Sequence, residues 1–113
     1  MGFAASQGRL MMLVGRKTEL ELKLQMIQQQ RMYWGDVMAR TMMAAARSPG
    51  SYEPGSARAR KLEAFRVKVG QIDKMLEMEA QRIEKQHKAC ETEIQAVNKV
   101  IDSNIQRSFK LMG

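Results

Sequence analysis

Apolar residues recur at alternating steps of three and four along two long stretches of the chain. The first stretch runs Leu10, Leu13, Lys17, Leu20, Leu24, Ile27, Arg31, Trp34, Met38, Met42 and Ala45, where Lys17 and Arg31 interrupt the apolar stripe and are expected to extend their charges to its edge. The second runs Leu62, Phe65, Val69, Ile72, Leu76, Ala80, Ile83, His87, Cys90, Ile94, Val97, Ile101 and Ile105. This alternation is the heptad pattern of helices that pack side by side along a left-handed seam. The pattern predicts two long helices.

A short breaker separates the two stretches. Both prolines of the chain, Pro49 and Pro54, lie in the segment 48–56, and proline is the residue that most strongly stops a helix. We therefore predict a helix over about 9–47, a turn at 48–56 and a helix over about 57–111, with Ser56 as the N-cap of the second. The fold class is all-α: an elongated, coiled-coil-like antiparallel two-helix hairpin that forms a single domain over 1–113.

The seam of this hairpin is predicted from the aliphatic and aromatic members of both stripes. They are Leu20, Leu24, Ile27, Trp34, Met38, Leu62, Phe65, Val69, Ile72, Leu76, Ile83, Ile94, Val97 and Ile101. Further apolar residues flank the first stripe, including Leu22, Met26 and Val37. Two helices alone do not cover so wide a surface, so we expect the core to be completed by oligomerisation.

Two features interrupt the regular pattern. Two four-residue steps follow each other from Ile72 to Ala80, which is a stutter that locally relaxes the supercoil. Gly15, Gly35 and Gly70 lie inside the predicted helices, where each costs about 1 kcal/mol relative to alanine. Close approach of another helix is one reason for such glycines, and a local bend is the other.

Composition adds an unusual methionine content. The chain has 11 methionines among 113 residues, while aromatic residues make up only 5%. Methionine is flexible and fills irregular gaps. We expect the methionines to pack in the helix seam, and methionine-based copper chemistry is disfavoured.

The charge pattern bears on nucleic acids. The formal net charge is +7, but acidic and basic residues are interspersed along both predicted helices. The densest basic cluster comprises Arg58, Arg60, Lys61, Arg66 and Lys68. A nucleic-acid-binding protein more often interleaves such a block with aromatic residues. A solvated basic face is the preferred interpretation, and nucleic-acid binding is a third, less favoured function.

Candidate catalytic chemistry is sparse. His87 and Cys90 are three residues apart on one helical face, so a Cys–His nucleophile pair or half of a shared zinc site is conceivable. Both residues lie on the apolar stripe, however, and burial opposes thiolate formation. The sequence also has no glycine-rich phosphate loop. We expect structural roles for both residues, no catalytic residues, no cofactor, no metal and no enzymatic activity.

No apolar run reaches the length of a signal-peptide core or of a membrane span. We expect synthesis in the cytoplasm without a cleavable signal peptide.

The hairpin plan, the proline-containing turn and the surplus apolar surface at both ends resemble the needle and rod subunits of type III secretion systems. The segment Gly2–Gln7, followed by Arg9-Leu10 and Arg16-Lys17, is also similar to the start of uncharacterised small bacterial helical proteins. The first resemblance implies a self-assembling subunit of a bacterial surface or secretion-related filament, exported to the cell surface or beyond.

The partners expected on this reading are copies of the chain itself. The predicted interface residues are Phe3, Leu10, Met11, Leu13, Val14, Phe109, Leu111 and Met112. The alternative function is a coiled-coil stalk or export chaperone that binds a helical client protein through a flexible methionine-rich face.

Overall fold

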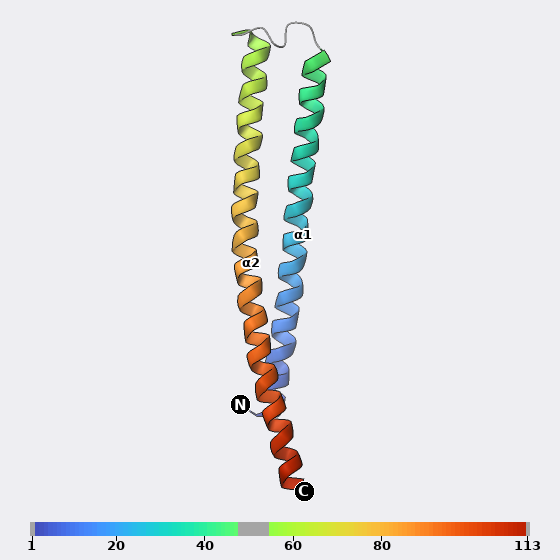
Figure 1. Ribbon diagram of the computed structural model, residues 1–113, viewed down its shortest axis with the longest axis vertical. Helices are drawn as coiled ribbons and strands as arrows, with labels where there is room; N and C mark the ends of the chain where they lie inside the picture. The colour runs from blue at the N-terminus through green and yellow to red at the C-terminus, as the bar shows by residue number, and fades with distance from the viewer. Residues whose placement is uncertain (1, 48–54, 113) are drawn as a thin grey trace. The chain divides into compact units, whose positions relative to one another are not determined.

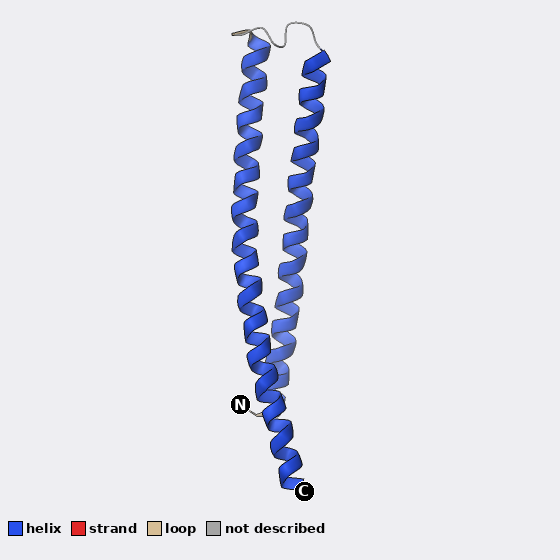
Figure 2. Ribbon diagram, in the orientation of Figure 1, coloured by secondary structure: helices blue, strands red, loops and turns tan. Residues whose placement is uncertain are grey.

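The computed structural model describes residues 2–47 and 55–112, and these residues form two helices (Figures 1 and 2). Helix α1 spans Phe3–Arg47, and helix α2 spans Ala57–Met112. No strand occurs within the described ranges. The predicted all-α helical hairpin is confirmed. Along the part of the chain that is described, neither helix has an apolar stretch that is long enough to cross a bilayer.

The chain divides into two compact units. Unit 1 comprises Met1–Leu24 and Arg82–Gly113, so it pairs the first half of α1 with the second half of α2. Unit 2 comprises Gln25–Gln81 and contains the other half of each helix. In unit 1 the two segments are antiparallel, because Arg9 pairs with Glu93 near one end of the contact and Glu21 pairs with His87 near the other.

The predicted start of α2 is confirmed. Ser56 caps the helix, since its hydroxyl accepts a hydrogen bond from the Ala59 backbone N–H at 3.1 Å. Such a side chain satisfies one of the backbone donors that a helix leaves free in its first turn. Gly55 precedes it with φ at 80°, a conformation that glycine adopts without steric cost. The rest of the predicted turn, 48–54, lies outside the described residues.

Helix α1 starts earlier than the sequence indicated. It begins at Phe3, six residues before the expected start at about Arg9, and the Ser6 N–H donates to the Gly2 carbonyl at 3.0 Å. The reason is that the alternation of three- and four-residue steps continues upstream from Leu10. The next positions of the stripe are Ser6 and Phe3, so this segment also has a face toward α2.

The predicted seam residues are all buried or half-buried within their own units. The most deeply buried apolar residues of the described chain are Leu13, Leu20, Ile27, Val69, Ala80, Ile83, Cys90 and Val97. All eight belong to the two stripes. The periodicity therefore identified which side of each helix faces the other.

The end of the first stripe differs from the prediction by one position. Thr41 is half-buried, whereas Met42 is exposed. Strict alternation of three and four from Met38 leads to Thr41 and then Ala45, so the periodic rule outweighs the hydrophobicity of Met42. At the predicted stutter, Glu79 is half-buried beside the buried Ala80.

The expectation that methionines fill the seam is wrong. Met38 is the only described methionine that is half-buried. The exposed ones are Met11, Met12, Met26, Met32, Met42, Met43, Met75, Met78 and Met112. Leucine, isoleucine, valine and alanine already occupy the regular seam positions, which leaves the flanking and outer positions for methionine.

Ser6 is a polar residue in an apolar contact. Its side chain is fully buried (0% exposed), and its hydroxyl has no hydrogen-bond partner among the described residues. A buried hydroxyl without a partner loses its hydration without compensation, at a cost of about 1–3 kcal/mol. The small size of serine suits a position where α2 lies close.

We expect Ser6→Ala to increase the free energy of unfolding by about 1 kcal/mol, because it removes the unpaired hydroxyl. Chemical denaturation followed by circular dichroism measures the change. Ser103→Ala is the matched control, since Ser103 is exposed and also lies inside a helix. If both variants gained the same free energy of unfolding, the cause would be the higher helix propensity of alanine, and the cost assigned to the Ser6 hydroxyl would be contradicted.

In unit 2 an ion pair joins the two helices. Arg31 on α1 donates from Nε to Asp73 Oδ1 at 2.9 Å and from Nη2 to Oδ2 at 3.3 Å. These hydrogen bonds hold the pKa of Asp73 below its usual value and raise that of Arg31. Arg31, which interrupts the apolar stripe, thus keeps its charge at the edge of the seam and gives it a partner.

Because the pKa of Asp73 is lower in the folded than in the unfolded state, the pair stabilises the fold above the usual aspartate pKa, about 3.9. This contribution is lost as the pH falls through the folded-state pKa. Asp73→Asn should therefore lower the melting temperature slightly at pH 7, with the difference shrinking in acid. Arg31→Lys should give an intermediate loss, because lysine lacks the two-point contact. A loss for Asp73→Asn that is independent of pH would contradict the assignment.

Candidate functional site

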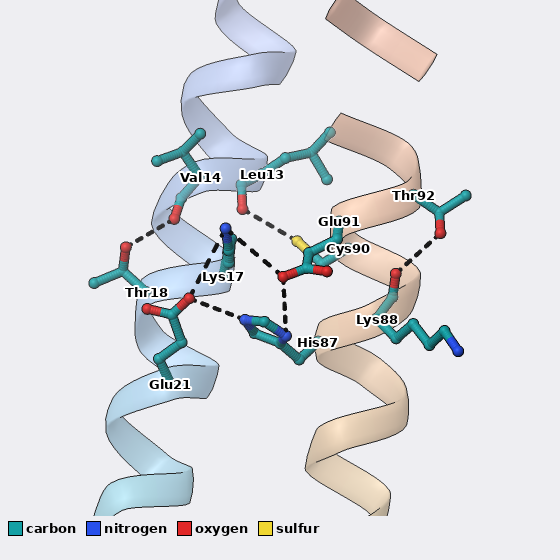
Figure 3. Close-up of polar contacts among 10 residues, drawn as sticks. All are labelled: Leu13, Val14, Lys17, Thr18, Glu21, His87, Lys88, Cys90, Glu91 and Thr92. Carbon is teal, nitrogen blue, oxygen red and sulfur yellow. Dashed lines mark hydrogen bonds and ion pairs between the residues drawn. The ribbon is translucent and has the colours of Figure 1, made fainter. Parts of the chain in front are cut away.

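A polar layer crosses the helix contact of unit 1 (Figure 3). The half-buried His87 on α2 places Nε2 2.9 Å from Oε1 of Glu21 on α1 and Nδ1 3.5 Å from Oε1 of Glu91 on its own helix. The Lys17 ammonium lies 4.0 Å from Glu21 and 3.8 Å from Glu91. The four side chains form one network that links α1 to α2.

The two carboxylates of this network share their donors. A neutral imidazole has only one N–H, so it can donate to only one of the two carboxylates. Lys17 lies close to both of them and is the cation that they share.

Cys90 lies one turn further along the same face of α2. Its buried thiol donates to the Leu13 backbone carbonyl at 3.1 Å. The His87 ring nitrogens face Glu21 and Glu91, and Cys90 bonds to the backbone of the other helix (Figure 3). The geometry is that of a packed structural thiol, as expected from its position on the stripe. Within the described ranges, no group of three or more histidine, cysteine or acidic residues is placed to hold a metal ion.

The basic cluster at the start of α2 is only partly gathered on one face. Arg58, Lys61 and Lys68 are exposed, and their spacing of three and seven residues places them on one side of the helix, whereas Arg60 lies on another side. Arg66 donates two hydrogen bonds to Glu63, at 2.6 and 3.1 Å, and the pKa of Glu63 is lowered as a result. The basic surface at the start of α2 is thus limited to three residues of one face, because Arg66 is paired with Glu63.

An apolar surface lies at one end of unit 1. Phe3 of α1 and five residues near the end of α2 line a hollow of about 270 Å³. Besides Phe3, its lining comprises Asn104, Ile105, Ser108, Phe109 and Met112. Phe109, Leu111 and Met112 are largely exposed. We call Phe3, Ile105, Phe109 and Met112 the terminal apolar surface; Leu111 does not line the hollow.

The second apolar surface is the outer side of α1. Ten large hydrophobic residues of this helix are exposed, against seven on the longer α2, of which four lie in its last eight positions. Large apolar side chains of α1 thus occur outside the face toward α2, among exposed polar and charged residues. A surface helix more often confines them to the face toward its neighbour.

The predicted interface residues fall into three groups. Phe3, Phe109 and Met112 lie together on the terminal apolar surface, whereas Leu111 on α2 and Met11 and Val14 on α1 are exposed elsewhere. Leu10 is half-buried, and Leu13, at 8% exposure, is buried against α2. Leu13 is thus a seam residue, because it continues the stripe that runs through Lys17 and Leu20. Sequence reasoning missed Ser6, Ile105 and the polar layer around His87 as features of these sites.

Comparison with known proteins gives no match: no family profile, no curated protein and no solved structure is significantly similar to the chain. The functional argument therefore depends on the residues and contacts described above.

The polar layer predicts that His87 and Glu21 act together. His87→Gln should lower the melting temperature, because it removes the ring that contacts Glu21 on α1 and Glu91 on α2. Glu21→Gln should cost less in the His87→Gln background than on its own, since the contact between the two side chains is already lost. Fully additive losses in the double variant would contradict this coupling.

Proposed function

We propose that the chain is a self-assembling structural protein and that its assembly is a helical filament. The observation that carries the proposal is that α1 exposes ten large hydrophobic residues although only one side of it faces α2. Monomeric soluble proteins rarely expose large continuous apolar patches. Burial of such surface stabilises association by about 25 cal/mol per Å².

The presence of two separate apolar surfaces supports an open-ended assembly. A dimer closes through one self-complementary patch, whereas a filament requires at least two different contacts on each subunit. The outer side of α1 and the terminal apolar surface provide two different patches. A bacterial surface or secretion-related setting is part of the same proposal and is supported by the hairpin plan shared with needle and rod subunits.

The terminal apolar surface should control polymer growth. Phe109→Ser removes a largely exposed aromatic ring from it and should convert filaments into small oligomers, with little change in melting temperature. Gln106→Ser is the matched control at an exposed polar position of the same helix end. Size-exclusion chromatography with light scattering over a concentration series, together with negative-stain microscopy, measures the outcome. A monomer at all concentrations for the unmodified chain would overturn the proposal.

The second candidate is an escort protein for a helical client. The nine exposed methionines favour it, because a flexible thioether surface adapts to different apolar partners. A monodisperse dimer that binds an amphipathic helical peptide, and loses it when Met11 and Met12 are replaced by glutamine, would support the escort over the filament.

A further inference from the structure

A second heptad stripe runs along α1 in unit 1, on the side opposite the seam. It follows steps of four and three through Ala4, Gly8, Met11, Gly15, Thr18 and Leu22. All six residues are exposed. We call this set the outer stripe. Its spacing is that of a helix-packing surface, yet α2 lies on the other side of α1.

The outer stripe is apolar along its whole length. It contains no charged residue, and the one polar side chain is satisfied locally, because the Thr18 hydroxyl donates to the Val14 carbonyl at 3.0 Å. The neighbouring Glu19 and Lys23 pair with each other at 3.4 Å. Burial of the stripe therefore desolvates no unpaired group.

The two glycines of the stripe have no explanation within one hairpin. No atom lies within 4 Å of the position that a Cβ would take at Gly8 or Gly15. Glycine inside a helix is nevertheless the least favourable residue other than proline. Both glycines leave shallow positions on the surface, seven residues apart, between the larger side chains of the stripe.

We infer that the outer stripe binds the outer stripe of a second copy of the chain, with the two α1 segments antiparallel. Centring the two-fold axis beside residue 13 places Met11 opposite Gly15 of the partner subunit, Gly8 opposite Thr18 of the partner subunit, and Ala4 opposite Leu22 of the partner subunit. Every large side chain then meets a small one, as close helix packing requires.

The neighbouring heptad registers are poorer. If the partner helix is shifted by one heptad so that the two-fold axis moves toward the N-terminus, Thr18 and Leu22 have no stripe residue opposite them. A shift toward the C-terminus sets Met11 against Leu22 of the partner subunit, which are both large. The stripe is thus complementary to itself in one antiparallel register, which selects a second copy as its occupant. The resulting dimer has two α1 segments inside and two α2 segments outside.

This inference rests on the proposed self-assembly and specifies one of its contacts. Its test is disulfide trapping in a Cys90→Ala background that retains native helicity. A mixture of Ala4→Cys and Leu22→Cys chains should form a mixed disulfide in high yield. Ala4→Cys alone should not, because its two copies lie about 27 Å apart along the helix axis in this register. Efficient crosslinking of Ala4→Cys alone would indicate parallel helices and overturn the inference.

A packing test complements the trapping. Gly15→Leu should keep or increase the melting temperature of the hairpin, since the site is open and leucine favours helix, but should weaken self-association at least tenfold. Gly70→Leu is the matched control on α2, where the Cβ position is equally open, and should leave association unchanged. Unaltered association of Gly15→Leu would refute the outer-stripe contact.

The two proposals fail on different results. If the unmodified chain assembles but neither the disulfide trapping nor the Gly15→Leu variant gives the expected result, the assembly proposal stands and the outer-stripe contact does not. If it stays monomeric, both fall.

Discussion

The packing of one apolar stripe on α1 against one on α2 is the interaction on which the structure depends. Each helix has a single intramolecular neighbour within its unit, so its interior is one line of side chains rather than a three-dimensional core. Among the described residues, only eight apolar side chains and Ser6 are deeply buried. Burial of a side chain such as leucine or isoleucine contributes about 1.5–3 kcal/mol, so loss of any one of these contacts removes a substantial part of the stability.

Polar contacts specify how the stripes align. An aliphatic seam tolerates slippage by a heptad, because each repeat resembles the next. In unit 1, the network of Lys17, Glu21, His87 and Glu91 matches charges in one alignment only, and in unit 2 the Arg31–Asp73 pair does the same. The groups are partly exposed, so their contribution to stability is modest. Their role as register markers is analogous to that of polar residues in coiled-coil cores.

Periodicity and helix-breaking residues were sufficient to predict the hairpin. The repeat of three and four identified the inward faces, and Ser56 was recognisable as a cap because serine precedes a helical run. The start at Phe3 was missed because residues 2–8 were judged by composition instead of by continuation of the stripe. The polar layer was missed because Lys17 and His87 interrupt the apolar pattern, and only the antiparallel alignment shows that Glu21 is opposite His87. The positions of the methionines were predicted wrongly because the number of methionines does not indicate which face of a helix they occupy.

The exposed methionines give the outer surface a chemical property that the seam does not share. Oxidants convert the methionine thioether into a polar sulfoxide, and methionine sulfoxide reductases reverse the reaction. Nine of these sulfur atoms belong to exposed residues, whereas the seam consists mainly of side chains without sulfur. Mild oxidation would therefore make the outer surface more hydrophilic while leaving the hairpin folded, and the proposed association between molecules would respond to redox conditions reversibly.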